Sequence, residues 1–110
     1  MIDERIYREM EEYGSQGWTV VDGLVAPDFF AALEAACRRV KARVRAGDID
    51  VYTHWGNPGE PWCIRGLLAP NFGEPIFADY LLHEPFLARA HAYLGTELRL
   101  GWIDLRTHTH

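Results

Sequence analysis

The sequence predicts an α+β fold in which several helices precede one long strand. Apolar residues recur at spacings of three and four through the first half of the chain, the period of an amphipathic helix. Residues 97–110 instead alternate with a period of two, the period of a strand. With 110 residues, 48% of them hydrophobic and 25% charged, the chain has the composition of one globular domain.

The first expected helix begins after Asp3, a residue type that caps helix N-termini. We expect Gly14 and Gly17 to end it, because glycine readily adopts the left-handed conformation found after helices. The apolar face would carry Ile6, Met10 and Tyr13. The aromatic and β-branched residues 18–21 then predict a short strand.

A second helix is expected from Pro27 to Arg45, with proline in the first turn and Gly47 after the last. Its apolar stripe, expected to face the core, consists of Phe30, Leu33, Cys37, Val40 and Val44. Basic residues crowd its last turns, where cations complement the negative end of the helix dipole. A solvated helix face explains this basic run, and a patch that binds phosphate or acid is the alternative.

Residues 48–75 are rich in glycine and proline and include Trp55 and Trp62. We expect a packed loop there, with a short strand at 62–65. Prolines then open two short helices, at 76–82 and 86–94. The buried side of the second would carry Phe86, Leu87, Ala90, Tyr93 and Leu94, with His91 near its rim.

The two faces of the final stretch change character partway along. Its even face passes from Leu98, Leu100 and Trp102 to ionisable residues, while its odd face becomes apolar at Ile103 and Leu105. A strand that enters a barrel with a polar interior has this pattern.

Several classes of function are disfavoured by composition. A net charge of −5 argues against a nucleic-acid surface. No apolar run approaches the roughly 20 residues that cross a bilayer, and the charged start lacks the apolar core of a signal peptide, so we expect a cytoplasmic protein without membrane contact. Cys37 and Cys63 are too few for a disulfide framework or a zinc motif.

Three segments, 17–25, 83–95 and 98–107, occur in an order and at a spacing that resemble the N-terminal part of the phytanoyl-CoA dioxygenase family. The first reads GWTVVDGLV and is followed by an amphipathic helix, and the second begins HEPFL and ends AYLG. The third is the strand that leaves this glycine. The resemblance covers most of the chain.

The resemblance implies an iron(II)- and 2-oxoglutarate-dependent oxygenase with a double-stranded β-helix core, of the jelly-roll or cupin-like type, braced by helices. Residues 1–110 would be a single domain or the N-terminal part of one, with a helical support region in 1–95 and a first long core strand in 96–110. The family binds iron through a His-x-Asp pair and a distant His, and this sequence contains no His-x-Asp. The resemblance therefore implies a portion that is inactive alone, its Fe(II) and 2-oxoglutarate belonging to the full enzyme.

No residue of this chain is assigned to catalysis, cofactor binding or metal binding. Asp104 and Arg106 on the strand, with Arg65 in the loop, are the candidates for lining a pocket for a small-molecule substrate, and a surface or structural role is the alternative for the arginines. For His108 and His110 a chain end without special role, a partial metal site and substrate contacts all remain open. The last strand would be an exposed edge, which predicts self-association. The rival interpretation of the whole chain is a non-catalytic α+β binding module that keeps the scaffold without the iron site.

Overall fold

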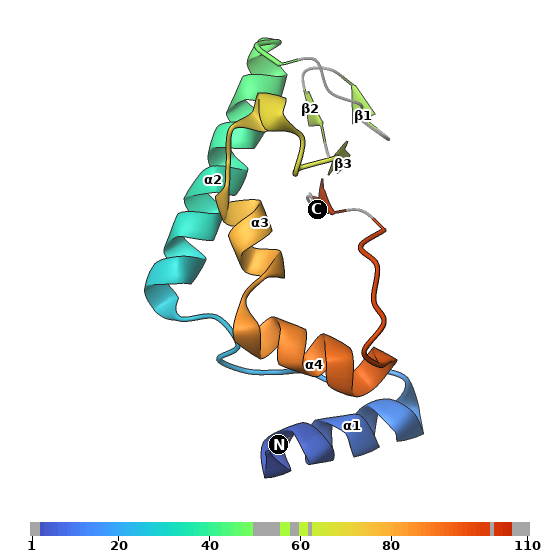
Figure 1. The fold of residues 1–110 in the computed structure, drawn as a ribbon. Helices are drawn as coiled ribbons and strands as arrows, with labels where there is room; N and C mark the ends of the chain where they lie inside the picture. Colours follow the sequence, from blue (N-terminus) through green and yellow to red (C-terminus); the bar gives the residue numbers. More distant parts are fainter. Residues whose placement is uncertain (1–2, 50–55, 58–59, 62, 102, 107–110) are drawn as a thin grey trace.

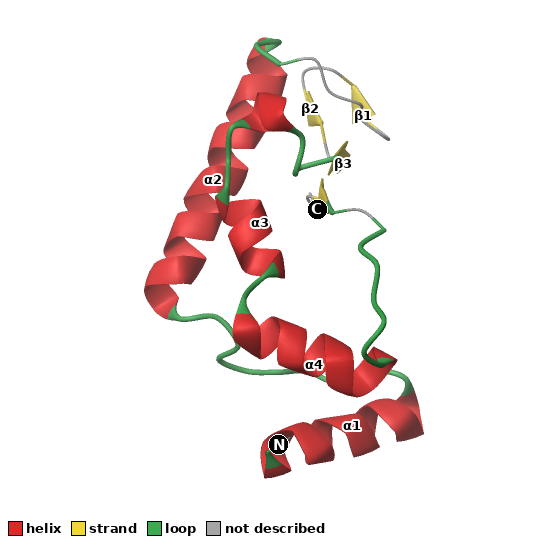
Figure 2. Cartoon of the chain, viewed as in Figure 1, coloured by secondary structure: helices red, strands yellow, loops and turns green. Residues whose placement is uncertain are grey.

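The structure, a computed structural model, describes residues 3–49, 56–57, 60–61, 63–101 and 103–106. Within these ranges the chain has four α-helices, one 3-10 helix and two small antiparallel sheets of two strands each, so the fold is α+β (Figures 1 and 2). None of the described helices combines the length and the apolar composition that crossing a bilayer requires.

The molecule is elongated, with extents of 47 × 27 × 26 Å and a radius of gyration of 16.2 Å. A compact domain of this length has a radius of gyration of about 13 Å. Figure 1 shows why: α2 runs along one side, α1 and α4 lie across the lower end, and the sheets lie at the upper end. The helices and sheets are therefore spread along one long axis and are not gathered around a single centre.

Helix α1 (Glu4–Gln16) begins and ends where its capping residues predict. The Asp3 carboxylate accepts a hydrogen bond from the backbone N–H of Ile6 at 3.0 Å. Gly17 has φ 84°, and its N–H donates to the carbonyl of Tyr13 at 2.8 Å. The expectation that Gly14 ends the helix was wrong, because Gly14 lies inside α1.

The strand expected at residues 18–21 is not formed. These residues have no regular structure, and Val20 is 68% exposed. β-propensity measures how well a side chain fits a paired, half-buried surface. No described strand lies beside this segment, so its β-branched residues have nothing to pair with.

Helix α2 (Pro27–Ala46) provides one wall of the core, and Gly47 caps its end. The buried cluster consists of Ala36, Val40, Val44, Ile64, Leu67, Phe72 and Phe77. Leu33 and Cys37 pack against it, as predicted. Phe30 was predicted to be buried but is 57% exposed, because the core covers only the later turns of the helix.

The basic run of α2 binds groups of its own chain. Arg39 makes a bidentate ion pair with Glu74, with N···O distances of 2.7 and 2.9 Å. Arg43 donates to the backbone carbonyl of Phe72 at 2.6 Å and so holds the 3-10 helix η1 (Pro70–Phe72) against α2. These contacts give the arginines a structural role in holding the loop.

The strands are short. β1 (Gly56–Asn57) pairs with β2 (Glu60–Pro61), and β3 (Cys63–Arg65) pairs with β4 (Asp104–Arg106). The strand predicted at 62–65 is thus found at Cys63–Arg65, while Trp55 and Trp62 lie outside the described residues. Of the strand expected at 96–110, residues 97–101 have no regular structure, β4 is formed, and 107–110 lie outside the described residues.

Helices α3 (Ile76–Leu81) and α4 (Glu84–Leu94) occupy the two predicted positions. Phe77 of α3 enters the core. The apolar side of α4 was predicted to be buried, but no residue of α4 is fully buried and Leu94 is 66% exposed. Helix α4 contacts α1 on one side and borders an open hollow on the other.

Candidate functional site

The β3–β4 ladder has one face on the core and one polar face. Ile64 lies opposite Leu105, and both pack into the core. Side chains alternate along a strand, and residues directly opposite each other point to the same face. The pairs Cys63–Arg106 and Arg65–Asp104 therefore share the other face, which we call the ladder face.

The ladder face brings together all three residues that the sequence singled out, namely Arg65, Asp104 and Arg106. They come from segments about 40 residues apart, joined by the antiparallel register of β3 and β4. The prediction placed Asp104 and Arg106 on one face of a strand, and that placement is confirmed. Their role in binding a substrate stays a prediction.

The carboxylate of Asp104 is the central group of the ladder face. Its Oδ2 atom accepts hydrogen bonds from Arg106 Nη2 at 3.2 Å and Nε at 3.3 Å, and lies 4.0 Å from Cys63 Sγ. The side chain of Asp104 is only 10% exposed, against 61% for Arg106. Its Oδ1 atom is buried and has no hydrogen-bond partner in the described part of the chain.

A buried carboxylate oxygen without a partner destabilises the folded chain, because water has been removed and nothing replaces it. Such an oxygen can accept a hydrogen bond from a hydroxyl, amine or amide of a bound molecule. The guanidinium of Arg106, more than half exposed, can at the same time pair with an acidic group. The ladder face thus places an exposed cation beside a buried carboxylate oxygen that lacks a partner among the described residues.

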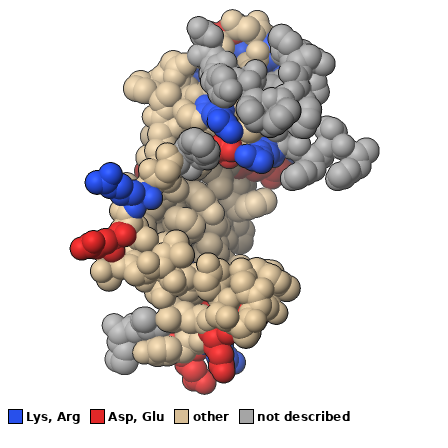
Figure 3. All heavy atoms as spheres, turned by 90° about the vertical axis from the view of Figure 1, so that its right-hand side faces the viewer, with Lys and Arg blue, Asp and Glu red and all other residues tan. Residues whose placement is uncertain are grey.

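A second feature is an apolar hollow of about 550 Å³, within the usual range for small-molecule sites. Its lining residues from α3, α4 and the following segment include Leu82, Phe86, Leu87, Ala90, Leu98 and Leu100. His91 and Arg99 add polar groups at the hollow. On the face of the molecule drawn in Figure 3, most side chains at mid-height are neither acidic nor basic. The sequence predicted an apolar side of α4 but not that this side is left open.

A buried ionic cluster joins α1 to α4. The Glu9 carboxylate is almost fully buried and accepts hydrogen bonds from Arg89 Nε at 2.9 Å, Arg89 Nη2 at 3.2 Å and the Tyr93 hydroxyl at 2.5 Å. The Arg5 guanidinium lies 3.3 Å away, and the rings of Tyr13 and Tyr93 stack at 5.4 Å.

Burial alone would raise the pKa of Glu9, but the hydrogen bonds from Tyr93 and Arg89 outweigh it and hold the pKa below its ordinary value. Burial and the neighbouring carboxylate raise the pKa of Tyr93 to about 12. The sequence held a signal for this cluster, because Glu9 occupies the same helical face as Ile6 and Tyr13. A carboxylate on an apolar stripe needs a partner from another element.

The iron of the resembled family does not fit the residues described. Within them, no three His, Cys, Asp or Glu side chains are grouped so that they could hold a metal ion. His83 lies at the start of α4 beside the ring of Phe29, at 5.5 Å between centroids, and His91 is exposed. His54, His108 and His110 lie outside the described residues. No step of oxygen chemistry is therefore assigned to the described side chains.

Comparison of the chain with protein-family models, with curated proteins and with solved structures finds no match. The class that the structure defines is an elongated α+β fold with a polar ladder face and an apolar hollow. Any narrower assignment depends on the residues and their geometry.

Proposed function

We propose that this chain is the N-terminal portion of an iron(II)- and 2-oxoglutarate-dependent hydroxylase of the phytanoyl-CoA dioxygenase type. In this proposal α1 to α4 brace the barrel, and β3 and β4 begin a double-stranded β-helix. The chain supplies one wall of a pocket for a small-molecule substrate, whose C–H hydroxylation the complete enzyme couples to decarboxylation of 2-oxoglutarate to succinate.

The observation that carries the proposal is the ladder face. A barrel strand needs one face on the outer helices and one turned toward a ligand. Ile64 and Leu105 meet the first requirement, and the buried Asp104 with its unpartnered oxygen suits the second. The elongated shape is compatible with the proposal, since a domain of this length that is complete in itself is usually more compact.

In this enzyme the residues of the ladder face bind and orient substrate. Asp104 Oδ1 accepts a hydrogen bond from a substrate hydroxyl or amine, and Arg106, with Arg65 beside Asp104 in the ladder, attracts an acidic group. Iron and 2-oxoglutarate are held by residues other than those described. A cytoplasmic location belongs to the same proposal, because both described cysteines are free thiols, which suits a reducing compartment.

The direct test is the coding sequence beyond His110 together with an activity assay. The proposal expects an in-frame His-x-Asp within a few tens of codons, followed by a distant His and Arg. The longer protein should form succinate with iron(II), ascorbate and 2-oxoglutarate, while the 110-residue chain should give no more succinate than a metal-free blank. In the longer protein Asp104→Asn should raise the KM for substrate, and Arg8→Met, on the exposed side of α1, should not. A stop codon directly after His110 contradicts the proposal.

The second candidate function is a non-catalytic binding module, and the apolar hollow favours it. An open, leucine-lined space of about 550 Å³ is suited to an apolar ligand without any metal. Under this alternative the 110-residue chain alone binds an apolar fluorescent probe, and the bulky substitution Ala90→Trp abolishes binding. Loss of probe binding in that variant, with a native stop codon after His110, would decide for the module.

A further inference from the structure

Residues 97–101, which we call the open segment, connect α4 to β4 without regular structure. In Figure 1 the open segment runs along the side of the molecule opposite α2. None of its backbone N–H and C=O groups forms a hydrogen bond with another described residue. A row of unpaired backbone groups is a template for pairing with another strand.

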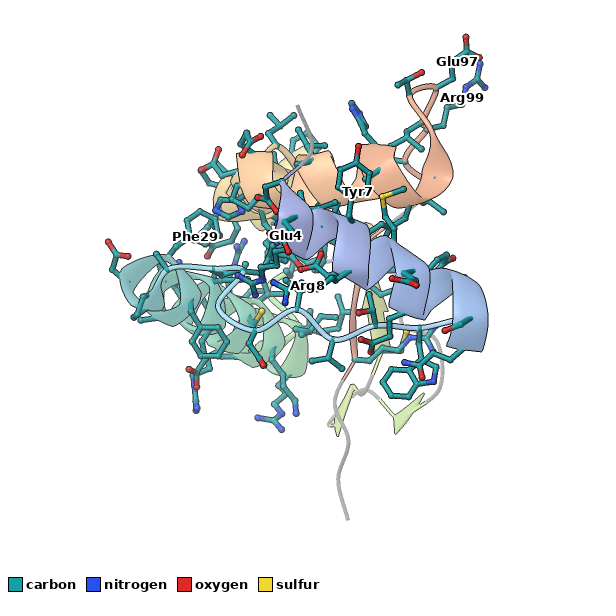
Figure 4. All side chains as sticks on the ribbon, turned by 90° about the horizontal axis from the view of Figure 1, so that it is seen from below. Glu4, Tyr7, Arg8, Phe29, Glu97 and Arg99 are labelled. Carbon is teal, nitrogen blue, oxygen red and sulfur yellow. The ribbon has the colours of Figure 1, made fainter. Side chains whose placement is uncertain are left out.

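The side chains of the open segment are all exposed, and they differ in polarity. Leu98 and Leu100 give the hollow apolar lining, Arg99 adds a charged group to that lining, and Glu97 is not among the lining residues. Figure 4 shows Glu97 and Arg99 projecting together, away from the helices. Neither forms an ion pair within the described part of the chain. The segment thus has the alternation of a strand whose partner is not yet present.

We propose that two copies of this chain associate through their open segments, as an antiparallel pair centred on Leu98. In this register Leu98 lies opposite Leu98 of the second copy, and Glu97 lies opposite Arg99 at both ends of the pair. A parallel pair in register would instead place glutamate on glutamate and arginine on arginine, which is repulsive. The order Glu-Leu-Arg is therefore complementary to itself in the antiparallel arrangement.

The apolar surface beside the open segment also favours a second copy of the chain as the partner. Side chains directly opposite in an antiparallel pair lie on one face, so the leucines of both copies form one continuous row over the two hollows. This row would shield leucines that are now exposed, among them Leu82 at 71% and Leu94 at 66%. Exposed apolar patches of this kind mark interaction sites.

This inference does not depend on the proposed function. The pairing is a property of the 110-residue chain, and any further strand that pairs with the same edge would compete with it. If the charge reversals described below leave the dimer unchanged, the result expected from the coding sequence beyond His110 still stands. If the coding sequence contradicts the proposed function, the dimer is still expected.

The first experiment measures the dimer dissociation constant by sedimentation equilibrium. The chain should dimerise, and Glu97→Arg and Arg99→Glu should each weaken the dimer about tenfold or more, because each places like charges opposite each other twice. Glu11→Arg and Arg8→Glu, the same charge reversals on the exposed side of α1, should leave the dissociation constant unchanged.

The decisive sample is an equimolar mixture of the two weakened variants. In the mixed pair, the copy that carries Glu97→Arg presents an arginine at both charged positions of its open segment. The copy that carries Arg99→Glu presents a glutamate at both, so every arginine lies opposite a glutamate. The mixture should therefore form heterodimers with about the affinity of the unmodified chain, and this recovery also shows that both variants fold. A dimer that ignores both reversals, or a mixture that stays monomeric, overturns the proposal.

The register is tested by disulfide formation. Directly opposite residues in an antiparallel pair have Cβ atoms about 4.5–5.5 Å apart, close to what a disulfide requires. Leu98→Cys should therefore crosslink two copies under mild oxidation much faster than Val20→Cys, an exposed residue that lies outside the hollow and the open segment. Equal crosslinking of the two variants, or an unmodified chain that stays monomeric while an apolar ligand fills the hollow, contradicts the pairing.

Discussion

Arg89 of α4 donates hydrogen bonds from Nε and Nη2 to the two carboxylate oxygens of Glu9 in α1, across 80 residues of sequence. Both side chains are nearly nine-tenths buried or more. Replacing one partner of a buried pair leaves a charge without compensation, so Arg89→Ala should lower the free energy of unfolding by about 3 kcal/mol. Urea denaturation measures this loss. Arg38→Ala, which breaks the exposed pair with Glu34, is the control and should lower the free energy of unfolding much less, because an exposed ion pair contributes little.

The same cluster predicts how stability depends on acid. The pKa of Glu9 is lowered by folding, and that of Glu74 is lowered by its hydrogen bonds with Arg39. A carboxylate with a lowered pKa contributes stability above its unfolded pKa and loses it as the pH falls through the folded value. The free energy of unfolding should therefore decrease as the pH is lowered below about 4.5. In Glu9→Gln this decrease with pH, the acid limb, should be less steep. An acid limb of the same slope in Glu9→Gln would show that Glu9 does not contribute.

At alkaline pH the stability of the fold should decrease as the pH rises, because folding raises the pKa of Tyr93. The pKa of Tyr93 is raised to about 12, so the unfolded chain loses this proton first, from about pH 10 upward. The stabilisation is complete below pH 10 and should disappear between pH 10 and 12. Tyr93→Phe should remove that part of the alkaline loss, and Tyr7→Phe, on the exposed side of α1, should not. Thermal melts over this range make the comparison.

Two phenylalanines provide a matched test of the core. Phe77 is buried in the cluster, whereas Phe30 is exposed despite its place on the apolar stripe of α2. Phe77→Ala should cost about 3–5 kcal/mol of unfolding free energy, and Phe30→Ala should change it by less than about 0.5 kcal/mol. A large loss in Phe30→Ala would mean that another part of the chain covers this end of α2.

Asp104 is expected to contribute nothing to the free energy of unfolding, or to lower it. Its Oδ1 atom is buried without a hydrogen-bond partner among the described residues, so Asp104→Asn should leave stability unchanged or raise it by about 1 kcal/mol. Arg106→Ala should lower stability, by about 1 kcal/mol, because it leaves the Asp104 carboxylate without its cation. Chemical denaturation of both variants checks the order, and a loss above about 2 kcal/mol in Asp104→Asn would give Asp104 a structural role.

The helices could be predicted because their signals are local. Asp3, Gly17, Pro27 and Gly47 mark helix ends through contacts within one or two turns. The strands depend on partners far along the chain, so residues 18–21 have strand-forming side chains and no strand, while β4 forms only where β3 lies beside it.

The site shows the same division between local pattern and distant partners. Period-two alternation placed Asp104 and Arg106 on one face, but only the register with β3 adds Arg65 and Cys63. The apolar stripe of α2 showed which face of the helix meets the core, but not how far along the helix the core extends. The burial of Phe30 was therefore predicted wrongly. The open hollow beside α4 could not be predicted, because periodicity shows which side is apolar and not what covers it.

The buried cluster takes its residues from α2, α3 and the segment between them, and none from α1 or α4. Helix α1 is joined to α2 by residues 18–26, which have no regular structure, and contacts the rest mainly through α4. The chain should thus open in two cooperative units. Amide protons of α1 and α4 would exchange with solvent from a partly opened state in which α2 remains folded. Those of the later turns of α2 would exchange only when the whole chain unfolds.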